Sequence, residues 1–96
     1  MSTQRNVAAG ILEQLAAWGD RSVYGMVGDS IFHLMDALAR QDNVQFYHVR
    51  HEETAALMAS AQAKLTGQIG VCIADGGPGM VHLLNGLADA CADGVP

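Results

Sequence analysis

Three times along this chain, a short run rich in β-branched or aromatic residues leads through a turn into a segment with helical periodicity. The runs are residues 23–27, 44–49 and 69–74, and the periodic segments that follow them are residues 31–38, 52–66 and 80–92. A further helical segment, residues 4–18, precedes the first run. Strands that alternate with helices in this way lie parallel and are joined by right-handed crossovers. The alternation predicts an α/β fold of the order α-(βα)3, with three layers: a parallel sheet and helices on both of its faces.

The spacing of apolar residues predicts which side chains of the helices are buried. In the first segment the predicted stripe is Val7, Ile11, Leu15 and Trp18, with Ala8 and Leu12 beside it. In the last segment the predicted inward positions are Leu83, Leu84, Leu87 and Cys91. A glycine follows the first and third helical segments, Gly19 and Gly67, as is usual at helix ends. The alanines of residues 52–66 permit close packing, either within the domain or against another subunit.

The length of the chain bounds its organisation. Its 96 residues suffice for one domain at most. Three strands are few for a parallel sheet, which needs cover on both faces. The chain stops after a helix and a turn, where another strand is expected. We therefore expect residues 1–96 to be the first part of a larger α/β domain.

The small number of charged residues limits the classes of partner. Only 16% of the residues are charged, the net charge is −5 and there is one lysine, so nucleic acid is not an expected partner. Scarce charge also predicts that some apolar surface is buried against something outside the chain. Cys72 and Cys91 form no CxxC pair, and the N-terminus has no signal-peptide pattern. We expect reduced, buried thiols in a cytoplasmic protein with no membrane span.

In a parallel sheet the loops that follow the strands meet at one edge, where α/β proteins place their chemistry. Here these loops are Gly28-Asp29-Ser30, Arg50-His51-Glu52 and Asp75-Gly76-Gly77-Pro78-Gly79. Asp29 or Ser30 is a predicted cap of the next helix. Glu52 is a candidate catalytic carboxylate, and the alternative is that Glu52 and Glu53 only complement the helix dipole. His51 is a candidate proton shuttle or ligand, or else a partly exposed polar contact.

The glycine-rich loop after residue 74 has two interpretations. It lacks the lysine of a P-loop and the spacing of a dinucleotide fingerprint, so we expect no diphosphate site there. It is either a bare backbone platform for a flat ligand or a strand-to-helix turn that needs a positive φ. His82 and Asn85, in the helix that follows, are equally compatible with an exposed face. The spacing of His, Cys, Asp and Glu predicts no metal site.

Taken together, the motifs resemble those of one enzyme family. In chain order they are Val27-Gly28-Asp29-Ser30, Arg50-His51-Glu52-Glu53-x-Ala55-Ala56, Ala63-Lys64-Leu65-Thr66-Gly67, Gly70-Val71-Cys72, Gly77-Pro78-Gly79-x2-His82-Leu83-x-Asn85-Gly86-Leu87-x-Asp89-Ala90 and Asp93-x-Val95-Pro96. The set is similar to the N-terminal, pyrimidine-binding (PYR) domain of thiamine diphosphate enzymes and most resembles pyruvate oxidases. Acetolactate synthases and related carboligases share the Glu and the Gly-Pro-Gly loop.

The resemblance implies a role for each loop. Glu52 would hydrogen-bond the N1′ atom of the cofactor's aminopyrimidine and would be the catalytic residue. The cofactor-binding residues would be Glu52 together with Gly77, Pro78 and Gly79, which would lie against the pyrimidine. The substrate cleft would be lined by Gly28, Asp29, Ser30 and His51. No residue of this chain would bind metal.

The resemblance also implies an activity that needs more than this chain. The enzyme would decarboxylate pyruvate or a related 2-oxo acid and oxidise the hydroxyethyl intermediate through FAD. Its cofactors would be thiamine diphosphate, Mg²⁺ and FAD, the latter two held by other domains. A second subunit of a homo-oligomer would complete the site, so residues 1–96 alone would be inactive. The alternatives are an acetolactate synthase-like carboligase and a non-catalytic domain that pairs with other subunits.

Overall fold

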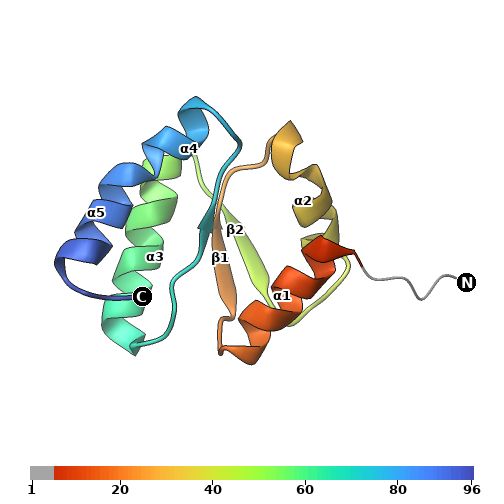
Figure 1. Cartoon of the computed structure of the whole chain (residues 1–96), viewed down its shortest axis with the longest axis horizontal. Helices are drawn as coiled ribbons and strands as arrows, with labels where there is room; N and C mark the ends of the chain where they lie inside the picture. Colours follow the sequence, from red (N-terminus) through yellow and green to blue (C-terminus); the bar gives the residue numbers. More distant parts are fainter. Residues whose placement is uncertain (1–5) are drawn as a thin grey trace, which may run out of the picture.

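The computed structural model describes residues 6–96, in which helices and strands alternate along the chain (Figure 1). The elements are α1 (Val7–Ala17), β1 (Ser22–Gly25), the 3₁₀ turn η1 (Asp29–Ile31), α2 (Phe32–Ala39), β2 (Gln45–His48), α3 (Glu52–Thr66), β3 (Cys72–Ile73), α4 (Pro78–His82) and α5 (Leu84–Ala92). Residues 4 and 5, at the start of the first predicted helix, lie outside the described residues. No helix within residues 6–96 has the length and apolar character needed to cross a membrane.

The three strands form one parallel sheet in the order β2-β1-β3. Val23 of β1 is paired with Phe46 of β2, and Tyr24 is paired with Cys72 of β3. Helices α1 and α2 lie on one side of the sheet and α3 on the other, where α5 packs against α3 (Figure 1). The predicted α/β class, with a parallel sheet and helices on both faces, is confirmed.

The two faces of the sheet are packed differently. On the α1–α2 face, the buried cluster consists mainly of larger side chains, among them Leu12, Val23, Leu38 and Val44. On the other face, α3 contributes the buried residues Ala55, Ala56, Ala59, Ser60 and Ala63. There Gly86 of α5 lies so close to α3 that a Cβ atom on it would be 2.3 Å from Ala56 Cβ. These alanines pack inside the domain, whereas Ala61 is exposed.

The predicted inward stripe of α1 is wrong. The buried residues each come one position after the predicted ones, so a neighbouring stripe of the helix faces the core. Val7, Ile11 and Trp18 are 80%, 46% and 59% exposed, and the buried residues are Ala8 and Leu12. Both stripes are apolar, so helical periodicity does not distinguish them. Leu15, which the two stripes share, packs against the core. Ala8 and Leu12 belong to the buried cluster of this face.

The last predicted helix is also different in the structure. It begins at Pro78 and divides into α4 and α5 at Leu83. Leu83 is buried, but the predicted inward residues Leu84, Leu87 and Cys91 are exposed. The reason is that Gly86, on the face opposite to these side chains, makes the close approach to α3. The prediction of a buried Cys91 is therefore wrong; Cys72 is half-buried, and both thiols are free.

The start of α2 and the lengths of the strands differ in detail from the prediction. Neither Asp29 nor Ser30 caps α2, because η1 comes between and α2 begins at Phe32 without a side-chain cap. All three strands are shorter than the predicted runs, β3 most of all. In contrast, α3 has the predicted bounds and ends at Gly67, whose φ of 74° suits glycine.

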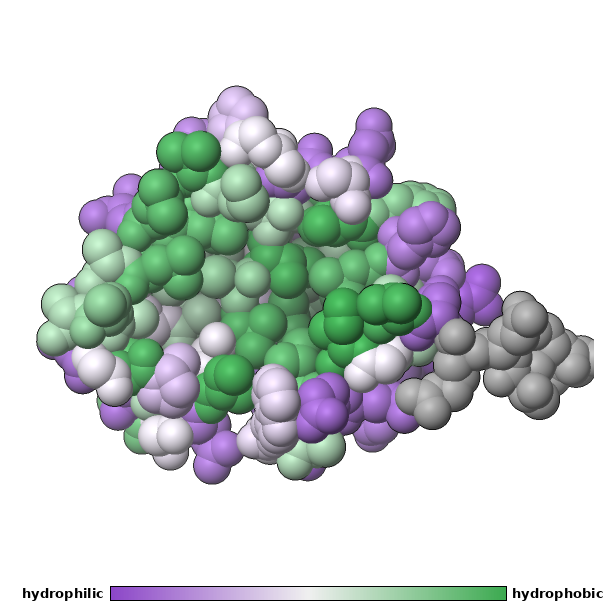
Figure 2. All heavy atoms as spheres, in the orientation of Figure 1, coloured by the Kyte–Doolittle hydropathy of each residue, from purple (hydrophilic) through white to green (hydrophobic). Residues whose placement is uncertain are grey.

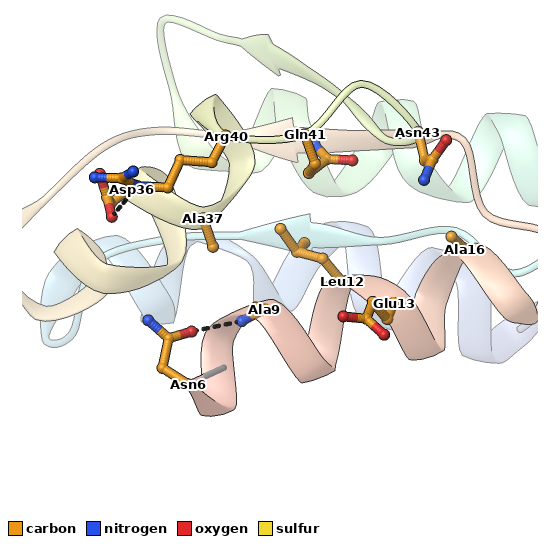
Figure 3. A pocket seen from close by; sticks show the side chains of 10 residues that line it. All are labelled: Asn6, Ala9, Leu12, Glu13, Ala16, Asp36, Ala37, Arg40, Gln41 and Asn43. Atoms are coloured by element: carbon orange, nitrogen blue, oxygen red, sulfur yellow. Dashed lines mark hydrogen bonds and ion pairs between the residues drawn. The ribbon is translucent and has the colours of Figure 1, made fainter. Parts of the chain in front are cut away.

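Apolar side chains remain exposed on several elements. In Figure 2 they run across the middle of the visible face, with polar residues mainly at the rim. The large exposed ones include Leu65, at 87%, and also Met80, Val81, Leu84 and Leu87 around α4 and α5. A groove of about 500 Å³ also separates α1 from α2 and is lined by Leu12, Ala37 and polar residues such as Asn6 and Gln41 (Figure 3). That another domain or subunit covers apolar surface stays a prediction.

Candidate active site

The start of α3 places Glu52 at the edge where the parallel strands end. Three residues separate Glu52 from the end of β2. His51 is the N-cap, with an extended backbone at φ −151° and ψ 138°, and its Nδ1 accepts a hydrogen bond from the Glu53 backbone N–H at 3.1 Å. This cap fixes the first turn of the helix. Glu52 therefore occupies the first helical position, next to the positive end of the helix dipole.

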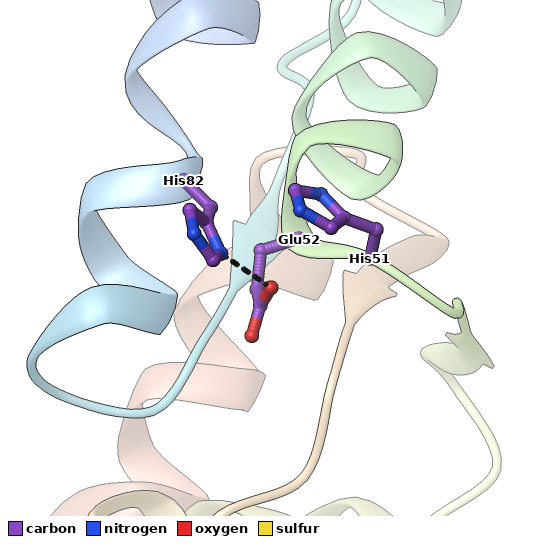
Figure 4. Close-up of side chains that lie close together, drawn as sticks. All are labelled: His51, Glu52 and His82. Atoms are coloured by element: carbon purple, nitrogen blue, oxygen red, sulfur yellow. Dashed lines mark hydrogen bonds and ion pairs between the residues drawn. The ribbon is translucent and has the colours of Figure 1, made fainter.

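The carboxylate of Glu52 is held by a histidine from another helix. His82, at the end of α4, donates from Nδ1 to Glu52 Oε1 at 3.0 Å (Figure 4). The Glu52 side chain is only 15% exposed. The hydrogen bond from His82 is the main cause that lowers the pKa of Glu52, and the backbone N–H of Glu52 and the charges of His82 and His51 act in the same direction. Glu52 is therefore an ionised acceptor at neutral pH.

The two histidines lie against each other beside Glu52. Their ring centroids are 4.5 Å apart with an interplanar angle of 26°, a stacked pair (Figure 4). His51, Glu52 and His82 each offer a possible ligand atom, and these atoms lie within 4.8 Å of one another. Nitrogen lone pairs lie in the planes of their rings, so two stacked imidazoles direct them side by side and not toward one ion. Stacking thus disfavours the tetrahedral arrangement that zinc requires.

The glycine-rich loop brings bare backbone onto the Glu52 carboxylate. Gly77 has a φ of 83°, which favours glycine, and Pro78 follows as the first residue of α4. One residue later, a Cβ atom on Gly79 would lie 2.9 Å from Glu52 Oε2. The loop is therefore a strand-to-helix turn that needs a positive φ at Gly77, and Gly79 presents backbone without a side chain to the carboxylate. That it is a platform for a flat ligand stays a prediction.

The first loop reaches this edge through a different contact. The backbone N–H of Ser30 donates to Asp75 Oδ1 at 2.9 Å, and the Ser30 hydroxyl donates to the same oxygen. The Gly76 N–H donates to Ser30 Oγ at 2.9 Å. Gly28 also lies against the Asp75 side chain. The residues Gly28, Asp29 and Ser30 are thus joined to the base of the Gly77–Gly79 loop.

Sequence reasoning found part of this arrangement. The structure brings together the predicted residues His51, Glu52 and Gly79, but it adds His82 and Asp75. The signal for His82 was its position three residues after Gly79, which places both on one side of a helix that starts at Pro78. Glu53, at the same helix start, contacts Asn85 Nδ2 at 3.3 Å instead. Asp75 had no signal, because its partner Ser30 is 45 residues away.

The fold and the site define a class of α/β domain. In this class a carboxylate at the start of a helix lies under a glycine turn, at the edge where the parallel strands end. Comparison with known families is consistent with this class and makes it specific. The profile of the family described as thiamine pyrophosphate enzyme, N-terminal TPP binding domain, matches residues 5–96. The chain belongs to this family, whose cofactor is also called thiamine diphosphate.

The curated relatives include a pyruvate oxidase and acetolactate synthases. A pyruvate oxidase of Lactiplantibacillus plantarum is 51% identical over 96 residues, which cover 97% of this chain and 16% of the oxidase. The acetolactate synthase isozyme 2 large subunit of Escherichia coli is 42% identical over 91 residues, 95% of this chain and 16% of the subunit. A chloroplastic acetolactate synthase 2 of Zea mays is 40% identical over 86 residues, 90% of this chain and 14% of the synthase. The chain thus spans less than a fifth of the length of these relatives.

Proposed function

We propose that this chain is the pyrimidine-binding part of a thiamine diphosphate enzyme that decarboxylates pyruvate or a related 2-oxo acid and passes the electrons to FAD. The observation that carries the proposal is the ionised Glu52 carboxylate, held by His82 at 3.0 Å beneath the bare backbone of Gly79. Identity of 51% to a pyruvate oxidase supports the substrate and the oxidase activity. In this proposal residues 1–96 are the first part of the PYR domain of a longer cytoplasmic enzyme.

The residues present fit the aminopyrimidine ring of the cofactor. Glu52 Oε1 is engaged by His82, which leaves Oε2 on the side of Gly79. In the proposal, Oε2 holds a proton on the N1′ ring nitrogen, and a side chain at position 79 would stand in the way of the ring. Gly77 and Pro78 shape the turn that brings Gly79 to this place. When bound, thiamine diphosphate would supply the electron sink for decarboxylation of the 2-oxo acid.

The remaining parts of the enzyme are proposed to lie outside these residues. Mg²⁺ and the diphosphate would be held by another domain, and FAD by a third. A second subunit of a homo-oligomer would close the site, and it would cover apolar side chains that are exposed here, such as Met80 and Leu84. Gly28, Asp29, Ser30 and His51 would line the substrate end of the cleft. Residues 1–96 alone would then be inactive.

The test is the substitution Glu52→Gln in the full-length enzyme, with Glu53→Gln as its matched control. Glutamine keeps the shape of the side chain but cannot hold a proton on the ring nitrogen in the same way. We expect turnover of pyruvate to fall by about 10²- to 10⁴-fold for Glu52→Gln and to change by less than about threefold for Glu53→Gln. Release of CO₂ is measured with thiamine diphosphate, Mg²⁺, FAD and an electron acceptor. Near-normal turnover of Glu52→Gln would remove Glu52 from this role.

A second candidate is an acetolactate synthase-like carboligase, which the 42% identity to the Escherichia coli synthase subunit favours. Such an enzyme would use Glu52 in the same way but would join two 2-oxo acids. Analysis of the products separates the candidates, because an oxidase yields acetate or acetyl phosphate and a carboligase yields acetolactate. The expected product is acetate or acetyl phosphate. Acetolactate as the main product would overturn the oxidase proposal and leave the role of Glu52 intact.

A further inference from the structure

Asp75 and Ser30 form a cluster that joins the loops after two neighbouring strands, and we call Ser30, Asp75 and Gly76 together the loop clamp. Asp75 Oδ1 accepts the Ser30 backbone N–H, at 2.9 Å, and the Ser30 hydroxyl. Ser30 Oγ accepts the Gly76 N–H at 2.9 Å. The strands β1 and β3 are paired up to Gly25 and Ile73, so both chains leave the sheet side by side. The loop clamp continues their connection beyond the last backbone pair.

The first loop depends on Asp75 because it has no cap of its own. Gly28 is the N-cap residue of η1, and it offers no side chain to the free N–H groups of that turn. Asp75 accepts the Ser30 N–H from across the sheet edge, which is the contact that an N-cap side chain usually makes within its own helix. The hydrogen bonds from Ser30 are the main cause that lowers the pKa of Asp75, so the contact is with an ionised carboxylate.

Gly28 shows how closely the two loops are matched. Its φ of −171° is extended backbone that any residue adopts. A Cβ atom at this position would nevertheless lie 2.2 Å from Asp75 Cγ and 2.3 Å from Asp75 Cβ. Glycine is therefore required by the nearness of the Asp75 side chain and not by the backbone conformation. The loop after β1 is therefore in close contact with Asp75, the residue that accepts its Ser30 N–H.

We infer that Asp75 is a positioning residue: it fixes the loop of Gly28–Ser30 against the loop of Gly76–Gly79 and thereby sets the affinity of the site for its 2-oxo acid. The inference rests on the function proposed above, in which the first loop lines the substrate cleft. Asp75 acts through Ser30 and Gly76 and takes no part in proton transfer. Loss of the loop clamp is therefore expected to change KM more than kcat.

The kinetic test compares three variants of the full-length enzyme, Asp75→Ala, Asp75→Asn and Ser30→Ala. We expect the KM for pyruvate to rise about tenfold in Asp75→Ala while kcat stays within about threefold. The substitution removes an ionised hydrogen-bond acceptor that positions the loop but takes no part in the chemical step. Asparagine keeps an acceptor oxygen of the same reach, so Asp75→Asn is expected to restore most of the affinity. Ser30→Ala keeps only one of the three hydrogen bonds, so its KM should rise as well. Because Ser30 itself is proposed to line the substrate cleft, the two Asp75 variants decide the role of the loop clamp. The control is Asp42→Ala, an exposed acid at the opposite edge of the sheet.

A second measurement, amide hydrogen exchange, needs no turnover. In Asp75→Ala and Ser30→Ala, we expect exchange to become about tenfold faster in peptides covering residues 26–31 and 74–79, and to stay unchanged in α3. Unchanged exchange in both peptides would overturn the loop clamp. Faster exchange with an unchanged KM would overturn the role of Asp75 in affinity. So would an equal fall of kcat in Asp75→Ala and Asp75→Asn. A wild-type enzyme inactive on 2-oxo acids would contradict the proposed function, while the exchange data would still decide on the loop clamp.

Discussion

The helices on the two sides of the sheet are packed with residues of different size. On the α3–α5 face, alanines and Gly86 let two helices approach so closely that there is no room for one more carbon atom. On the α1–α2 face, larger side chains such as Leu12 and Leu38 fill the core, and a groove of about 500 Å³ is left between the helices (Figure 3). The Glu52–His82 pair joins the start of α3 to α4, which leads directly into α5. The more closely packed face thus positions the candidate active site.

The largest effect is expected when one carbon atom is added to the α3–α5 face. In Gly86→Ala the new Cβ would be 2.3 Å from Ala56 Cβ and 2.6 Å from the backbone carbon of Ala56. Backbone cannot move aside as a flexible side chain does, so the helices must separate. We expect the free energy of unfolding to fall by about 4 kcal/mol, as measured by urea denaturation followed by circular dichroism.

Gly10→Ala is the matched control on the other face. Gly10 is also a helical glycine, in α1, but nothing lies within 4 Å of the position that its Cβ would take. Alanine is the better helix former, so we expect a gain of about 0.5–1 kcal/mol in the free energy of unfolding. Equal effects of the two substitutions would show that the faces do not differ in closeness of packing.

A smaller loss is expected when carbon atoms are removed from the α1–α2 face. Leu12 is 3% exposed but also lines the groove, so the space left by Leu12→Ala opens into a space that already exists. We expect a loss of about 2–3 kcal/mol, at the low end for a buried leucine. Leu65→Ala, at a side chain that is 87% exposed, serves as the control and should change the free energy of unfolding by less than about 0.5 kcal/mol. A loss for Leu12→Ala as large as that for Gly86→Ala would contradict the comparison.

The smallest effect concerns the ion pairs at the far end of the α3–α5 face. Lys64 Nζ lies 2.7 Å from Asp89 Oδ2 and 2.6 Å from Asp93 Oδ2, and the Ser60 hydroxyl also donates to Asp89 at 2.8 Å. The hydrogen bond from Lys64, and then that from Ser60, lower the pKa of Asp89. A lowered pKa in the folded state gives stability that is fully present above the unfolded value of about 3.9 and is lost as the pH falls through the folded value.

The prediction is therefore a Tm that falls on acidification below about pH 4, with a shallower fall in Asp89→Asn. These side chains are partly exposed, so solvent screens the interaction and the difference is expected to be modest. At the alkaline end, the raised pKa of Lys64, due first to Asp89 and then to Asp93, acts in the opposite sense. That contribution is present below about pH 10 and is lost as the pH rises further. Parallel Tm profiles of the two proteins in acid would exclude a linked role of Asp89.

The sequence was sufficient for the order of the elements and for the edge at which the site forms. The bounds of α3 could be predicted because both of its ends carry local signals, the carboxylates after His51 and the left-handed Gly67. Local signals did not show which apolar stripe of α1 is buried. They also did not show that Leu84 and Leu87 point outward, because hydrophobic patterns do not detect a contact made by Gly86.

The contacts of the candidate site also include some that the sequence predicts and some that it does not. That Glu52 and the Gly77–Gly79 loop meet at one edge follows from parallel strands alone. That His82 reaches Glu52 depends on a helix that starts at Pro78, two residues earlier than predicted. The contact of Ser30 with Asp75 depends on the register between Gly25 and Ile73, which no short stretch of sequence specifies.

The central position of β1 has a consequence for the order in which the domain is assembled. Although β1 is first in the chain, it is paired with both later strands. Further hydrogen bonds continue this pairing at the strand starts, from Gln45 N–H to Arg21 O at 2.9 Å and from Tyr24 N–H to Val71 O at 3.1 Å. During synthesis, one side of β1 gains its partner after some twenty further residues, and the other side only after nearly fifty. The residues of β1, of β2 and of the start of α3 are thus synthesised before those of β3, and the edge that carries Glu52 can close only after the Gly77–Gly79 loop has been made.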